Sequence, residues 1–115
     1  MSSDNFIESM EALSWLERSD SKERIISEDS GMLLSSEDAL KLVRELYAAG
    51  ATEVLVRDIE VEDDLEDASS LVVNLPKDPK ARAALFVIEA RVLEEMGSSF
   101  DPEGEQGQDS FGLGW

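Results

Sequence analysis

The sequence predicts a small α+β domain, because two strong helix patterns alternate with two runs of β-branched and apolar residues. A length of 115 residues suits one domain. Hydrophobic residues make up 42% of the chain, which is enough for a core despite a net charge of −17. The expected architecture is a ferredoxin-like two-layer sandwich of order βαββαβ, or αββαβ, with an additional N-terminal helix.

Residues 1–18 are expected to form this N-terminal amphipathic helix. Phe6, Met10 and Leu13 follow one another at steps of four and three, which matches one face of a helix. Trp15 lies off this stripe. Its side chain is therefore expected either to contact a partner or to pack within the domain. Residues 19–35 are mostly polar and are expected to form a connector that can include a short strand.

Residues 36–115 are expected to form the α+β core domain. Its first helix begins after a cap at Ser35 or Ser36 and ends at Gly50, which can adopt a left-handed conformation. Two strands are expected at 52–59 and 71–75, where β-branched and apolar residues are frequent.

The last helix is expected to begin near Pro76 and Pro79 and to end before Gly97. Phe86 and Leu93 lie on a different face from its main apolar stripe, so this helix requires two partners. One partner is the sheet, and the other is either the first helix or another chain. Beyond it, the acidic segment 98–110 is expected to be an extended or mobile loop, and the alternation of Phe111, Leu113 and Trp115 predicts a final strand.

Acidic residues are densest between the two central strands. This run contains Glu60, Glu62, Asp63, Asp64, Glu66 and Asp67. One interpretation of this run is a solvated hairpin loop, and the other is a cation site or a patch that mimics phosphates. A calcium-binding loop that begins at Asp58 would need glycine at position 63 and glutamate at position 69, where the chain has Asp63 and Ser69. We therefore expect neither a metal nor a cofactor.

Positive side chains surround the start of the last helix, where they oppose the helix dipole. Lys80 and Arg82 should therefore have an acidic neighbour. One interpretation is that they pair with the acidic run between the strands, and the other is that they contact an anion or a partner.

Composition excludes most enzyme classes, because the chain has neither cysteine nor histidine. Acidic residues in the first twenty positions exclude a typical secretory signal, no apolar run approaches about 18 residues, and we expect a cytoplasmic protein. The chain has 27 Asp and Glu against 10 Lys and Arg, which favours a basic protein partner and disfavours direct binding of nucleic acid.

The function expected from these observations is a noncatalytic protein-interaction module, such as an inhibitor, an immunity-type protein or an accessory subunit. A homodimer is also compatible with the sequence. One alternative is a nucleic-acid mimic, whose carboxylates would imitate phosphates and occupy a basic nucleic-acid-binding protein. The other is a small ligand-binding domain or an enzyme that uses carboxylates alone.

Overall fold

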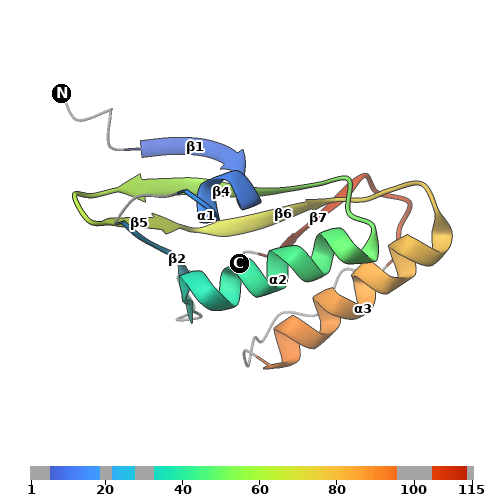
Figure 1. Cartoon of the computed structure of the whole chain (residues 1–115). Coiled ribbons are helices and arrows are strands. Elements are labelled where there is room, and N and C mark those ends of the chain that lie inside the picture. The colour runs from blue at the N-terminus through green and yellow to red at the C-terminus, as the bar shows by residue number, and fades with distance from the viewer. Residues whose placement is uncertain (1–5, 19–21, 28–32, 96–104, 114–115) are drawn as a thin grey trace.

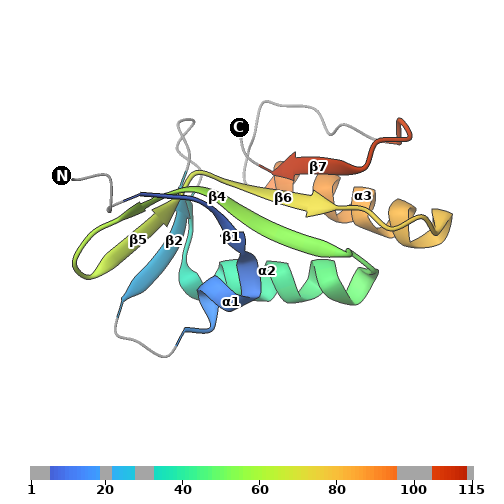
Figure 2. The same ribbon diagram turned by 90° about the horizontal axis from the view of Figure 1, so that it is seen from above.

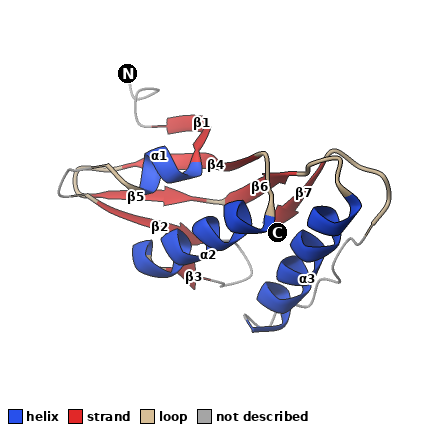
Figure 3. Ribbon diagram, turned by 45° about the vertical axis from the view of Figure 1, so that its right-hand side comes forward, coloured by secondary structure: helices blue, strands red, loops and turns tan. Residues whose placement is uncertain are grey.

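The computed structural model of the protein describes residues 6–18, 22–27, 33–95 and 105–113. These residues form seven strands and three helices, which confirms the α+β class (Figures 1 and 3). In chain order the elements are β1 (Phe6–Glu11), α1 (Ala12–Leu16), β2 (Glu23–Ser27), β3 (Leu33–Leu34), α2 (Ser36–Ala49), β4 (Glu53–Val61), β5 (Leu65–Ala68), β6 (Ser70–Asn74), α3 (Pro79–Glu95) and β7 (Ser110–Leu113).

The strands form one mixed sheet around β4. On one side, β4 pairs antiparallel with β1, and on the other side it pairs antiparallel with β5 and β6. β2 pairs parallel with β5, with β3 beyond it, and β7 pairs antiparallel with β6. β2 is parallel to β5 and β5 is antiparallel to β4, so β2 and β4, which precede and follow α2, run in opposite directions and do not form a split βαβ unit. β7 also extends β6 instead of joining β2. The ferredoxin-like strand order is therefore not confirmed.

The first segment is a strand followed by one short helix, so the expected N-terminal helix was wrong. In β1, Ile7 and Met10 both pack against the core although they are three residues apart. This spacing arises because the ladder between β1 and β4 is interrupted opposite Glu8, where Asp58 has a left-handed φ of 55°. The interruption shifts the inward-facing positions of the strand, and the result imitates the spacing of a helix.

The helices lie on one side of a curved sheet, and α1 and α2 are neighbours that both contact β4 (Figures 1 and 2). The core lies between these helices and the sheet. Its largest fully buried side chains include Trp15, Phe111, Leu46, Ile59, Leu71 and Leu85. Among the described residues, no helix covers the opposite face of the sheet.

The bounds of α2 agree with the sequence signals. The Ser35 hydroxyl accepts a hydrogen bond of 3.2 Å from the Asp38 amide, as expected for a cap. Gly50 ends the helix with a φ of 117°. A Cβ on Gly50 would lie 2.8 Å from the Cβ of Ala81 in the first turns of α3, so the two helices approach closely at this glycine.

Candidate functional site: an acidic turn beside a sheet edge

Four exposed carboxylates gather where β4 turns into β5, and we call Glu60, Glu62, Asp63 and Asp64 the acidic turn. Backbone hydrogen bonds hold it in place: the Glu62 amide donates to the Leu65 carbonyl at 2.8 Å, and the Glu23 amide donates to the Asp64 carbonyl at 3.0 Å. The acidic turn is therefore a tight hairpin end that concentrates negative charge in a fixed position.

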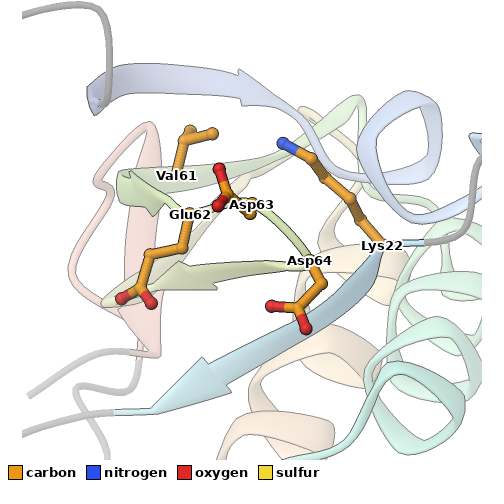
Figure 4. A pocket seen from close by; sticks show the side chains of 5 residues that line it. All are labelled: Lys22, Val61, Glu62, Asp63 and Asp64. Atoms are coloured by element: carbon orange, nitrogen blue, oxygen red, sulfur yellow. The ribbon is translucent and has the colours of Figure 1, made fainter.

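An open hollow of about 500 Å³ lies against the acidic turn (Figure 4). Its lining consists of Lys22, Val61, Glu62, Asp63 and Asp64. Its acidic side chains are exposed, whereas pockets for small molecules are usually enclosed and mainly apolar. The hollow therefore resembles a surface depression more than a pocket for a small substrate.

The acidic run is only partly a loop, because Glu66 and Asp67 belong to β5. The Glu66 side chain faces the core, and this residue is only 2% exposed. Asp67 faces the other side of the sheet and accepts a hydrogen bond of 2.6 Å from the Ser27 hydroxyl. These two carboxylates have internal partners, so the exposed negative charge of the run is concentrated in the acidic turn.

Glu66 lies at the centre of a buried polar cluster. The Trp15 indole N–H donates to Glu66 Oε1 at 2.7 Å, and Arg24 Nη2 and Lys22 Nζ approach Glu66 Oε2 at 3.5 and 3.4 Å. Burial alone would raise the pKa of Glu66, but the Trp15 hydrogen bond and the two positive charges outweigh it and hold the pKa below its usual value. The carboxylate is therefore charged at neutral pH.

Trp15 is completely buried, which corrects the view that its side chain is available to a partner. Two other residues proposed as partner contacts are also held inside the protein. Leu93 is buried, and the half-buried Phe86 packs on Phe111 of β7 with ring centroids 5.5 Å apart. Phe86 on the second face of α3 therefore packs against a strand of the same chain.

Arg82 does not pair with the acidic turn, as one interpretation expected, but with Glu105. Its guanidinium donates to the two carboxylate oxygens at 2.9 and 2.7 Å, and also to the carbonyls of Pro76 and Gln108. This pairing lowers the pKa of Glu105 to about 2. Arg82 thus holds the described end of the acidic C-terminal segment, whereas residues 98–104 lie outside the described part of the chain. Lys80 is exposed.

Replacing Arg82 with glutamine should lower the melting temperature and speed hydrogen exchange across residues 105–109, because four hydrogen bonds to the guanidinium are lost. Glu105→Gln should have a smaller effect, since both carbonyl contacts remain. Lys80→Gln is the matched control and should be neutral, because it removes an exposed charge that opposes the helix dipole. Equal exchange rates across residues 105–109 in all three variants would show that the hydrogen bonds of Arg82 do not hold this segment.

Two further carboxylates have lowered pKa values for structural reasons. The Arg91 guanidinium donates two hydrogen bonds to Glu45 across the α2–α3 interface and lowers the pKa of that carboxyl. Burial raises the pKa of Glu11, but hydrogen bonds from Tyr47 and from the amide of Ser14 outweigh this effect. A general acid requires a raised pKa, so these carboxyls, like those of Glu66 and Glu105, are unsuited to that role.

Exposed carboxylates also occur away from the acidic turn, for example at Glu37 on α2 and at Glu94 on α3. This spread counts against the hypothesis of a nucleic-acid mimic, because a mimic needs its negative charges on one face.

Within the described ranges, no group of three or more acidic side chains is placed to hold a metal ion. None of the helices in those ranges has the length and apolar content to cross a membrane.

Sequence reasoning missed the side chains that complete this region. Because the residues around Lys22 and Arg24 are polar, the sequence predicts that both lie in the connector. In the structure, Arg24 lies in β2 and pairs directly with Glu66 of β5. The alternation of Arg24 with the buried Ile26 is the signal that could have placed Arg24 on an inward face. The helical spacing places Phe6 on a buried stripe, but this residue is 50% exposed on β1.

Comparison of the chain with protein-family models, with curated proteins and with solved structures finds no match.

Proposed function

We propose that this protein is a noncatalytic interaction module whose acidic turn binds a basic protein. The observation that carries the proposal is the concentration of four exposed carboxylates on one rigid hairpin end, beside the exposed Phe6. Like-charged residues held in a fixed position attract an oppositely charged partner and raise its association rate. An inhibitor, an immunity-type protein or an accessory subunit would each use such a surface.

The chemistry of the chain supports binding more than catalysis. The sequence has no histidine and no cysteine, and structural partners lower the pKa values of Glu11, Glu45, Glu66 and Glu105. The hollow beside the acidic turn is open and lined by exposed carboxylates. We therefore do not extend the proposal to an enzyme.

A charge-matched pair of variants tests the proposal. One variant carries Glu62→Gln, Asp63→Asn and Asp64→Asn in the acidic turn. The control carries Glu37→Gln, Glu94→Gln and Glu95→Gln at exposed helix positions, so the two variants have the same net charge. Wild type and both variants are immobilised and used to capture proteins from a nuclease-treated native lysate at low and moderate salt.

The expected result is a basic protein retained by the wild type and by the control but not by the acidic-turn variant. With the purified partner, the acidic-turn variant should associate about tenfold more slowly at low salt, and this difference should disappear at high salt. Equal retention by the two variants would show that total charge, and not the acidic turn, determines binding. That result would contradict the proposal.

A further inference from the structure

The edge of the sheet formed by β1 has an open hydrogen-bonding side. β1 pairs with β4 along one side, and no other described strand or helix pairs with its opposite side (Figures 1 and 3). It is six residues long, whereas the other edge strands, β3 and β7, have two and four residues. The unpaired amides and carbonyls of such an edge can pair with a further strand.

The side chains of β1 leave this edge open to a strand of opposite charge. Natural edge strands often carry charged residues or proline, which discourage pairing, and β1 has no lysine or proline but carries the acidic Glu8 and Glu11. It also exposes Phe6, one of only two large hydrophobic side chains exposed among the described residues. An aromatic side chain on a sheet edge favours a cross-strand neighbour that is apolar or aromatic.

The charge around β1 decides which kind of strand fits. Phe6 pairs with Glu60 of the acidic turn, and the exposed Glu8 lies on β1 itself. A second copy of this chain would bring the same carboxylates together along the new seam, and each copy carries a net charge of −17. A segment with lysine or arginine would instead pair with these carboxylates.

We propose that β1 accepts an extended basic segment of a partner protein as an additional strand, with an apolar side chain beside Phe6 and basic side chains near Glu8 and Glu60. This inference rests on the proposed function and specifies the binding mode. The backbone of β1 supplies the affinity, and an apolar side chain with basic side chains near it on the same face of the strand supplies the selectivity. The acidic turn then guides the segment to the edge.

The probe is a peptide of lysine and valine, matched to β1 in length, in which a valine that can face Phe6 is followed and preceded on the same face of the strand by lysines. It is compared with an oligolysine of equal charge and with the same lysine–valine peptide methylated at alternate backbone nitrogens. Binding is followed by fluorescence anisotropy and by amide hydrogen exchange of the full chain. Two variants are matched: Phe6→Ser on β1, and Val87→Ser, which changes the other exposed hydrophobic side chain, on α3.

We expect the lysine–valine peptide to protect the β1 amides and to bind at least tenfold more tightly than its methylated form. Phe6→Ser should weaken binding about fivefold, and Val87→Ser should leave it unchanged. If the lysine–valine peptide and the oligolysine both bind only at the acidic turn, strand addition is wrong while the proposed function stands. Binding of neither peptide at low salt would count against both, and protection of β1 by a second copy without peptide would overturn the inference.

Discussion

Replacing Glu66 with glutamine should lower the free energy of unfolding by about 3 kcal/mol, because it removes the buried negative charge that Arg24 and the Trp15 N–H contact. The matched control is Asp67→Asn on the same strand, which should cost about 1 kcal/mol because its partner is the neutral Ser27 hydroxyl. Urea denaturation at neutral pH gives both values. Equal losses would show that the buried charge has no special role.

A double variant separates the contribution of the buried charges from the contribution of packing and hydrogen bonding. Replacing Arg24 with methionine together with Glu66 to leucine removes both charges, and apolar replacement of a buried ion pair is often neutral. The double variant should therefore be more stable than Glu66→Gln alone, although the Trp15 N–H loses its acceptor. A double variant less stable than Glu66→Gln would mean that the hydrogen bond to Trp15 is the larger contribution.

The effect of Glu66→Gln should also depend on pH. The pKa of Glu66 is lower in the folded chain than its usual value of 4.5, so the unfolded chain binds the proton more readily. The stabilisation from the charged carboxylate is therefore complete above about pH 5 and is lost as the pH falls through the folded pKa. The difference in unfolding free energy between wild type and Glu66→Gln should be constant near neutral pH and should shrink in acid.

The local signals of this chain predicted its regular elements well. The cap at Ser35 and the stop at Gly50 gave the bounds of α2, and the β-branched runs gave β4 and β6. These elements were predictable because each depends on nearby residues. The expected parallel crossover around α2 is not seen, because β4 runs antiparallel to β5, the neighbour of β2. The β2–β5 and β6–β7 pairings depend on contacts between distant segments, which local signals do not reveal.

The errors have specific physical causes. The break in the ladder at Asp58 placed Ile7 and Met10 three residues apart on the same face, so a strand had helical spacing. The sequence places Glu66 in a solvated loop because a charged residue is rarely buried. Its burial depends on Trp15 and Arg24, which are distant in sequence, so no local pattern could reveal it. The acidic turn itself was predictable, since its residues lie close together in the sequence.

Replacing Gly50 with alanine should lower the free energy of unfolding by about 3 kcal/mol. Part of this cost is the left-handed backbone, with a φ of 117°, which alanine adopts at a cost of about 1 to 2 kcal/mol. The remainder is overpacking, because the new Cβ would lie 2.8 Å from the Cβ of Ala81. Thermal or urea denaturation measures the total.

Two other glycines separate the two contributions. Gly107 has a φ of 76°, and no atom of the described residues lies within 4 Å of the position that a methyl group would take, so Gly107→Ala should carry only the backbone cost of about 1 kcal/mol. Gly112 lies in β7 with ordinary backbone angles and only the Leu71 carbonyl oxygen at 3.9 Å, so Gly112→Ala should change stability by less than about 0.5 kcal/mol.

The contact between Gly50 and Ala81 can then be tested by a double-mutant cycle. Ala81→Gly removes the methyl group that the new side chain would meet, at a cost of about 1 kcal/mol for glycine in a helix. Because α2 and α3 approach closely here, Gly50→Ala should be less harmful in the Ala81→Gly background, with a coupling of about 1 to 2 kcal/mol. Additive losses would mean that the helices separate without cost, and only the backbone conformation would then require glycine at this position.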